Sequence, residues 1–229
     1  MKSAVLTALR ARLAILGLFF WVGGAATGRA GDDFGSWHAL SARFLDNHRW
    51  TLTGVTQVRI RDDNSQLYAY YFSPQAAFKA SPYLRLGLNH TWLPAKPAGG
   101  RDFLLQRRWE IEATPRWPVK DWLTFELRNR LEIRRIEGRP DINERSRHRP
   151  RATFRVKGLG PLESVFMDNE VFHDYDAHRI TENRLVPLGL NFRANPQTAF
   201  AVNYLLRSVR SGGDWTHSHI LGTQLALSF

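Results

Sequence analysis

The sequence predicts an all-β protein: an antiparallel, up-and-down transmembrane β-barrel of about 10–12 strands that follows a cleaved signal peptide. Three observations predict this fold. The chain begins with a basic and then apolar segment typical of export, most of the remainder alternates apolar with polar residues, and the last strand ends on Phe229. The expected domains are a signal peptide over residues 1–30 and a barrel over residues 31–229.

The start of the chain has the three parts of a signal peptide. Basic residues are followed, over residues 13–22, by an apolar run, and residues 28–30 supply small side chains before a cut. The apolar run is short for a membrane helix. Cleavage is expected after Ala30, with Ala26 as the second choice, and an uncleaved anchor helix is the alternative.

The composition excludes several classes of protein. No other stretch is long and apolar enough for a membrane helix, and the mean hydropathy is −0.36, which excludes a helical membrane protein. The chain has no cysteine, so disulfides and thiol chemistry are absent. The formal charge of +11 falls to +7 without the four basic residues of the signal segment. In an exported chain this charge favours anionic lipopolysaccharide as a partner over nucleic acid.

Turn clusters divide the first half of the barrel into five predicted strands. The second of these sets Val58 and Ile60 against Arg59, and an Asp-Asp-Asn-Ser turn ends it. Pro74 weakens the third strand because proline cannot donate a hydrogen bond to the ladder. A loop rich in proline and glycine follows the fourth. The five strands are expected at residues 37–44, 50–61, 67–78, 83–92 and 104–114.

The second half contains the clearest alternation. Odd positions of residues 123–134 are mostly apolar and even positions mostly charged, and a polar loop is expected over residues 137–147. In a later strand Val186 falls on the apolar, lipid-facing side. Arg184 is grouped with the charges expected in the lumen, although strict alternation would place it on the outer face, beyond the membrane band. The strands are expected at residues 123–134, 148–157, 162–172, 182–193, 198–208 and 220–229.

The number of strands stays open. Eleven are counted, whereas bacterial barrels normally have an even number, so either the N-terminal segment adds a twelfth or the first strand is not part of the wall. Short turns alternate with mostly longer, more polar loops, as periplasmic turns alternate with outer loops in barrels. This alternation places Phe229 on the periplasmic side.

The final ten residues resemble the assembly signal of outer-membrane barrels. Apolar residues, including Leu225 and Leu227, alternate with small or polar residues up to the terminal Phe229. The resemblance implies that the barrel assembly machinery reads these three residues and that the protein lies in the cell outer membrane of a Gram-negative bacterium.

A series of segments, in order along the mature chain, resembles a known family. They are Phe34-Gly-Ser-Trp37, Trp50, Asp62-Asp-Asn-Ser65 before Tyr70-Tyr71, Arg107-Arg108, Leu127-Arg-Asn-Arg-Leu-Glu132, Asp168-Asn-Glu-Val-Phe172, Glu182-Asn-Arg184 with Gly189, and Leu221-Gly222 before Phe229. Their order and spacing are similar to those of the bacterial "domain of unknown function 2490" proteins. The resemblance implies a small outer-membrane barrel and implies no activity.

Charged residues at alternate positions are expected to line the lumen. Facing arginine and glutamate side chains in so narrow a barrel would either plug and stiffen it or form a narrow pore that prefers anions, since arginine outnumbers the acids. The predicted lumen-lining residues are Arg59, Arg85, Arg108, Glu110, Glu112, Glu126, Arg128, Arg130, Glu132, Arg134, Arg151, Arg155, Asp168 and Glu170. The expected function is therefore a non-enzymatic outer-membrane barrel, structural or porin-like.

Two other classes of function remain as alternatives. A lipid- or lipopolysaccharide-modifying hydrolase needs a serine, a base and an orienting group, and the chain offers Ser146 beside His148, and Ser218 between two histidines, without a diagnostic spacing. His173, Asp174, Asp176 and His178 could bind a metal by type, but they also suit an ordinary polar loop. We expect no catalytic residue, no metal and no cofactor. A soluble periplasmic β protein is the second alternative.

The expected partners are outer-membrane lipids and lipopolysaccharide. Four arginines in or beside the loop after residue 136 are positioned to bind lipopolysaccharide phosphates: Arg139, Arg145, Arg147 and Arg149. Aromatic residues near strand ends are expected to form girdles at the two membrane interfaces: Trp37, Trp50, Trp92, Trp109, Trp117, Trp122 and Tyr68. No nucleic acid is expected, and the sequence gives neither a solute nor an oligomeric state.

Overall fold

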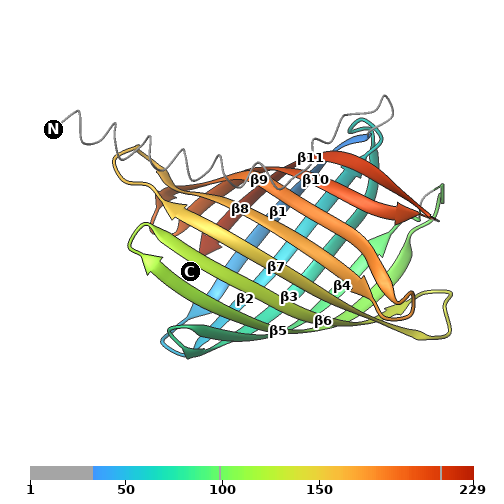
Figure 1. The fold of residues 1–229 in the computed structure, drawn as a ribbon, viewed down its shortest axis with the longest axis horizontal. Coiled ribbons are helices and arrows are strands. Elements are labelled where there is room, and N and C mark those ends of the chain that lie inside the picture. The colour runs from blue at the N-terminus through green and yellow to red at the C-terminus, as the bar shows by residue number, and fades with distance from the viewer. Residues whose placement is uncertain (1–32, 98, 212) are drawn as a thin grey trace. The chain divides into compact units, whose positions relative to one another are not determined.

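The protein forms one closed β-barrel in a computed structural model that describes residues 33–97, 99–211 and 213–229. The signal peptide predicted for residues 1–30 lies outside the described residues. Within those described residues, no helix has the length and apolar character needed to cross a membrane. The all-β prediction is confirmed (Figure 1).

Eleven strands make up the wall, and each pairs with the next one along the chain. Their bounds are β1 Asp33–Asp46, β2 Trp50–Arg61, β3 Gln66–Ser81, β4 Leu84–Ala95, β5 Leu104–Lys120, β6 Leu123–Ile136, β7 Ile142–Arg155, β8 Leu162–Asp174, β9 Arg179–Asn195, β10 Thr198–Ser211 and β11 Asp214–Ser228. All ten sequential pairs are antiparallel. The count of eleven lies within the predicted range.

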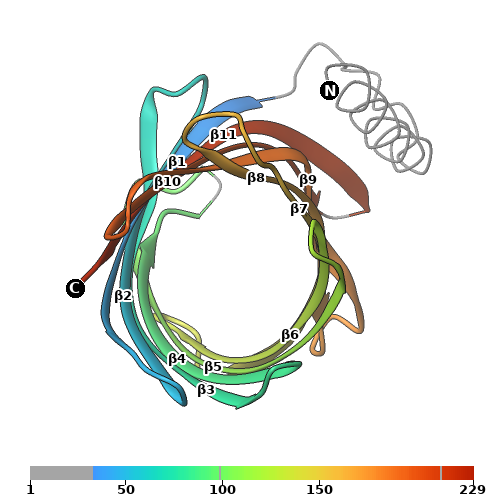
Figure 2. The same cartoon turned by 90° about the vertical axis from the view of Figure 1, so that its left-hand side faces the viewer.

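The barrel closes through a parallel pair. β1 runs beside β11 in the same direction, with Leu40 opposite Leu225 (Figure 2). An odd number of strands joined by hairpins leaves the first and last strands pointing the same way, so the closing pair has to be parallel. The odd count is thus real, and β1 is a wall strand.

Several strands extend into segments predicted to be loops. β7 begins at Ile142, so the loop expected over residues 137–147 is wrong in most of its length, and β11 begins at Asp214, before the predicted start at residue 220. Alternation of apolar and polar residues marks only the part of a strand that lies against lipid. Beyond that band both faces are polar, and the pattern resembles a loop although the ladder continues.

The outer surface of the barrel is apolar and the inner one is polar, the reverse of a soluble protein. Exposed side chains on the outer face include Leu88, Ile111, Leu188 and Leu221. A continuous apolar surface of this kind indicates a lipid environment.

Aromatic side chains pair near both ends of the outer face. Phe44 stacks on Phe229 with ring centroids 6.1 Å apart, and Trp50 lies 5.0 Å from Phe78. Toward the opposite end Phe72 stacks on Trp92 at 6.0 Å. Phe229 itself is 82% exposed, so its ring lies on the outside of the barrel.

A bulge at Pro187 changes which residues of β9 face inward. The pairing of β9 shifts by one residue against both β8 and β10, and Pro187 has no partner in either ladder. Arg184 and Val186 therefore face the lumen before the bulge, whereas Gly189 faces it afterwards. The prediction that Val186 faces lipid is wrong, and Arg184 faces the lumen although strict alternation would have placed it outside, because alternation fails where a proline cannot donate to the ladder.

Gly189 leaves space for a buried aromatic ring. It pairs with Phe166 across the ladder, and a methyl group added at Gly189 would overlap that ring. The ring cannot easily withdraw, because the Arg151 guanidinium lies 4.2 Å from its centroid on the lumen side.

Substitution Gly189→Ala is expected to destabilise the barrel by about 1–3 kcal/mol, the usual cost of overpacking. The measurement is the midpoint of urea unfolding in detergent micelles. Gly158→Ala is not a suitable control because of its positive φ of 79°, so Ala201→Gly, a lumen-facing change that removes a methyl group, serves instead. An unchanged midpoint for Gly189→Ala would contradict the packing described for Phe166.

Candidate functional site in the lumen

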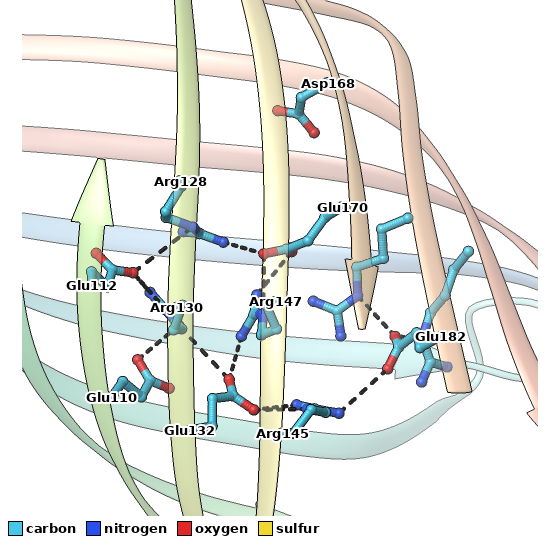
Figure 3. Close-up of polar contacts among 12 residues, drawn as sticks. Glu110, Glu112, Arg128, Arg130, Glu132, Arg145, Arg147, Asp168, Glu170 and Glu182 are labelled. Atoms are coloured by element: carbon cyan, nitrogen blue, oxygen red, sulfur yellow. Dashed lines mark hydrogen bonds and ion pairs between the residues drawn. The ribbon is translucent and has the colours of Figure 1, made fainter. Parts of the chain in front are cut away.

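Arginine and acidic side chains from six consecutive strands form a continuous band on one side of the lumen (Figure 3). Alternation along β5 to β10 turns every second side chain inward, and the charged residues of these strands fall on that phase. We call this set the Arg/Glu band; its members are Glu110, Glu112, Arg128, Arg130, Glu132, Arg145, Arg147, Glu170, Glu182, Arg184 and Arg207.

Glu132 lies at the centre of the band and is 0% exposed. Its Oε2 accepts hydrogen bonds from Arg145 at 2.5 and 2.8 Å, and its Oε1 accepts one from Arg147 Nη1 at 2.6 Å. Arg108 and Arg130 place a guanidinium nitrogen 4.0 Å from Oε1. One carboxylate therefore faces four cations, with both of its oxygens in use.

Arg147 connects this centre to the next strand. Its Nε and Nη2 donate to the two carboxylate oxygens of Glu170 at 3.0 and 2.8 Å, a bidentate contact. Glu170 also receives a hydrogen bond from Arg128, which crosses from β6 over β7 to reach it. Arg147 thus holds together carboxylates of β6 and β8.

Glu182 extends the band to β10. Its Oε1 accepts from Arg184 Nε at 2.8 Å and from Arg207 Nε at 2.7 Å, and Arg145 lies 4.0 Å from its Oε2. At the other end Arg130 forms an ion pair with Glu110 at 2.7 Å and donates to Glu112. The band therefore joins the inner faces of β5 to β10 through charge-assisted hydrogen bonds and ion pairs.

A cluster of apolar side chains from β1 and from β8 to β11 also fills part of the lumen. It consists of Trp37, Phe166, Val186, Leu205 and Ile220, all buried. Trp37 had been predicted to lie at the membrane interface, and that prediction is wrong. Asp33 and Arg43 share the odd positions of β1 with Trp37, whereas Phe34, Leu40 and Phe44 take the even positions. This pattern was the signal that could have placed Trp37 in the lumen.

Trp37 lies between two arginines. The guanidinium of Arg59 is 4.2 Å from its ring centroid and that of Arg184 is 4.8 Å away. Its buried indole N–H has no hydrogen-bond partner within the described residues. Tyr68, also predicted at the interface, faces the lumen as well, 5.2 Å from Arg61.

Two cavities follow one another along the lumen. One of about 410 Å³ occupies the middle, and another of about 570 Å³ lies toward the end where β1 begins. Six residues line both cavities, and we call this boundary between them the constriction: Trp37, Arg59, Leu93, Arg108, Arg184 and Ile220. The constriction combines three cations with three apolar side chains.

The structure places the residues expected to line the lumen as follows. Ten line the middle cavity: Arg59, Arg85, Arg108, Glu110, Glu112, Arg128, Arg130, Arg151, Asp168 and Glu170. Arg134 lines the second cavity and Glu132 lies within the band. Glu126 and Arg155 line a separate cavity beside the β5–β6 turn.

Sequence reasoning missed several charged residues of the lumen. They include Arg145, Arg147, Arg149, Glu182 and Arg207. Arg145, Arg147 and Arg149 had been assigned to an outer loop that binds lipopolysaccharide, and this is wrong, because they lie on β7 and face inward. These arginines occupy every second position, and Arg151 continues the series. This alternation was the signal that could have revealed a strand with one charged face. Arg139, the fourth, lies in the connection between β6 and β7.

The loop residues considered as metal ligands have protein partners. Asp174 accepts from Arg134 Nη2 at 2.8 Å and from Asn143, and Asn143 also bonds Asp176. His173 lies against Tyr175. Across residues 33–229, apart from 98 and 212, no group of three or more acidic or histidine side chains is arranged to hold a metal ion.

The comparisons with known proteins agree with the fold. The crystal structure of the β domain of the Bordetella autotransporter BrkA is similar, with a TM-score of 0.52 and 13% sequence identity over 81% of this chain and 86% of that one. A search among curated proteins found no similar sequence. A family model described as "Protein of unknown function (DUF2490)" matches residues 34–218. The match covers most of the chain and agrees with the order of the segments noted in the sequence, so this barrel belongs to the DUF2490 family.

Proposed function

We propose that the protein is an outer-membrane barrel whose lumen is a narrow, anion-preferring conduit, braced by the Arg/Glu band and requiring no catalysis for this role. The observation that carries the proposal is the constriction, where two cavities meet between three arginines and Trp37. A ring of cations at the narrowest point of a pore attracts anions and repels cations.

Of the three arginines at the constriction, Arg59 has no ion pair among the described residues, whereas Arg184 pairs with Glu182 at 2.8 Å and Arg108 lies 4.0 Å from Glu132. Arg59 lies against the rings of Trp37 and Tyr71 and donates to Gln57 at 2.6 Å. Arginine also outnumbers aspartate and glutamate in the lining of the middle cavity. The charge left over supports a preference for anions, while the paired charges support a rigid wall.

The apolar outer face and its paired aromatics support insertion among outer-membrane lipids. The assembly signal proposed for Leu225, Leu227 and Phe229 is compatible with this placement, since Phe229 projects to the outside of the barrel. We propose that the barrel assembly machinery and outer-membrane lipids are the partners of the mature chain.

The test is single-channel recording of the refolded protein in a planar bilayer with a KCl gradient. A small conductance and a reversal potential on the chloride side are expected. The variant Arg59→Gln/Arg184→Gln should reduce the preference for chloride, because it removes two of the three charges at the constriction. Arg116→Gln, an exposed arginine outside the constriction, is the control and should leave the reversal potential unchanged.

Cation preference in the wild-type channel, or no conductance from a barrel that shows a heat-dependent shift in gel mobility, would contradict the proposal. In the second case the band and the apolar cluster would together act as a plug.

A further inference from the structure

A serine, a histidine and an asparagine are hydrogen-bonded in a row on the lipid-facing side of the wall. Ser146 and His148 lie two residues apart on β7, and Asn129 pairs with His148 from β6. Arg145, Arg147 and Arg149 face the lumen, so the residues between them face outward. His148 Nε2 is 3.3 Å from Ser146 Oγ, and His148 Nδ1 is 2.8 Å from Asn129 Oδ1.

The backbone fixes the direction of these hydrogen bonds. Asn129 Nδ2 donates to the carbonyl oxygens of Leu127 and Ala113, at 3.3 and 3.5 Å. Because its NH₂ group is committed to two acceptors, its Oδ1 faces the imidazole and can only accept. His148 therefore carries its proton on Nδ1, and the lone pair of Nε2 is directed at the hydroxyl of Ser146. This is the arrangement in which a histidine acts as a base toward a serine.

A second serine and histidine on the outer face have the opposite direction of hydrogen bonding. His38 Nε2 lies 3.0 Å from Ser36 Oγ, and its Nδ1 lies 2.8 Å from Thr223 Oγ1. Ser36, however, donates its own proton to Asn64 Oδ1 at 2.5 Å. His38 must therefore donate to Ser36 and cannot act as its base. The two sites share a Ser-x-His spacing, but only in the first does the serine donate its hydrogen bond to the histidine, as a nucleophile does to its base.

The surroundings of Ser146 suit a lipid substrate. Leu127 and Leu131 lie on the same face of β6 on either side of Asn129, and Leu131 is in register with Ser146. Ile133, the next residue on that face toward the end of β6, pairs with Trp109. Tryptophan marks the membrane interface, which is the depth at which the ester groups of lipids lie.

We propose that Ser146, His148 and Asn129 form an acyl-ester hydrolase site that cleaves fatty acyl esters of membrane lipids. Ser146 and His148 are the catalytic residues, and Asn129 is a positioning residue that holds the imidazole. The site lies on the opposite side of the wall from the conduit, goes beyond the function proposed for the lumen, and replaces the expectation of a protein without catalytic residues.

The reaction follows from the hydrogen-bond directions. Ser146 Oγ bonds to the ester carbonyl carbon as its proton passes to His148 Nε2, and collapse of the tetrahedral intermediate breaks the bond to the lipid alcohol, which takes that proton. A water molecule, deprotonated by His148, then attacks the acyl-serine. His148 returns that proton to Ser146 Oγ as the fatty acid is released. His173 on β8 pairs with Ser146 across the ladder, and its imidazole is of the type that stabilises an oxyanion by donating a hydrogen bond.

The experiment measures fatty acid release by the refolded mature protein and labelling of its serine by a long-chain fluorophosphonate. One arm uses vesicles of phosphatidylethanolamine and phosphatidylglycerol, and the other uses the same vesicles containing lipopolysaccharide. Release in the first arm identifies phospholipid as the source of the ester, and release only in the second identifies lipopolysaccharide. Ser146→Ala should abolish both labelling and release, and His148→Ala should lower release by about 10²–10⁴-fold.

The second serine and histidine provide the matched controls. Ser36→Ala and His38→Ala should leave release and labelling unchanged, and every variant is first checked for the heat-dependent gel shift of a folded barrel. Asn129→Leu should lose release, whereas Asn129→Asp, which can still accept from Nδ1–H, should retain it. Absence of release and labelling in both arms from a folded wild-type barrel, or labelling that persists in Ser146→Ala, would overturn the proposal, whichever way the conductance experiment ends.

Discussion

Substitution Glu132→Gln is expected to lower the free energy of unfolding of the barrel by about 3–5 kcal/mol, the loss typical of removing one partner from a buried ion pair. The change keeps the size of the side chain but removes the negative charge that Arg145 and Arg147 share. It also replaces one acceptor oxygen by an NH₂ group, which is a donor and faces the arginine donors. The measurement is equilibrium unfolding by urea or guanidinium in detergent micelles.

Glu126→Gln is the matched control on the same strand. Glu126 lies 3.8 Å from Arg116 and is partly exposed, so water screens the charges and the expected loss is below about 1 kcal/mol. Equal losses for the two variants would show that the Arg/Glu band does not stabilise the barrel through its buried charges.

A double variant separates the effect of the unpaired arginine charge on stability from the effect of side-chain packing. In Glu132→Gln/Arg145→Met one of the uncompensated cations is removed, and part of the lost stability should return. A double variant that is less stable than Glu132→Gln alone would indicate that Arg145 contributes chiefly through Glu182 or through its contact with Phe172.

Alternation was sufficient to predict the fold because a barrel wall has two different environments. On β6, the apolar residues Phe125 and Leu127 face lipid, and the charged residues Glu126 and Arg128 face inward. The fold class was predicted from this alternation and the family from the order and spacing of segments along the chain, and both are confirmed. The odd strand number was not decided, because a parallel closing pair leaves no mark in the sequences of β1 and β11.

The charged lumen was only partly predictable. Arg145 and Arg147 were assigned to a loop because polar residues lie on both sides of them, and only the ladder shows that Ser146 faces outward while they face inward. Strict alternation put Arg184 on the outer face because it did not include the one-residue shift of register at Pro187. The proline was visible in the sequence, but whether it ends a strand or forms a bulge depends on neighbours far along the chain.

Asn129 shows the limit of reading one strand at a time. Ser146 and His148 are two residues apart and could be considered together, but the residue that orients the imidazole lies nineteen positions earlier, on another strand. In the alternation of β6, Asn129 is merely a polar residue on an apolar face. Only the register of β6 against β7 makes it the partner of His148.

Substitution Trp37→Ala is expected to raise the single-channel conductance severalfold. Trp37 is the largest side chain of the constriction and lies between Arg59 and Arg184. Removing the indole would join the cavities of about 410 and 570 Å³ into one wider path. The two arginines remain, so the channel should keep its preference for anions while passing more current.

The same substitution empties part of the apolar cluster, at a cost of about 3–5 kcal/mol. Trp37→Leu retains part of the packing and keeps the test informative if the alanine variant does not fold. Trp109→Ala removes a tryptophan from the lipid-facing surface and is the control, which should leave conductance unchanged. An unaltered conductance in a folded Trp37→Ala barrel would mean that the narrowest point lies elsewhere, and the Arg/Glu band at Arg147 would then be the next constriction to widen.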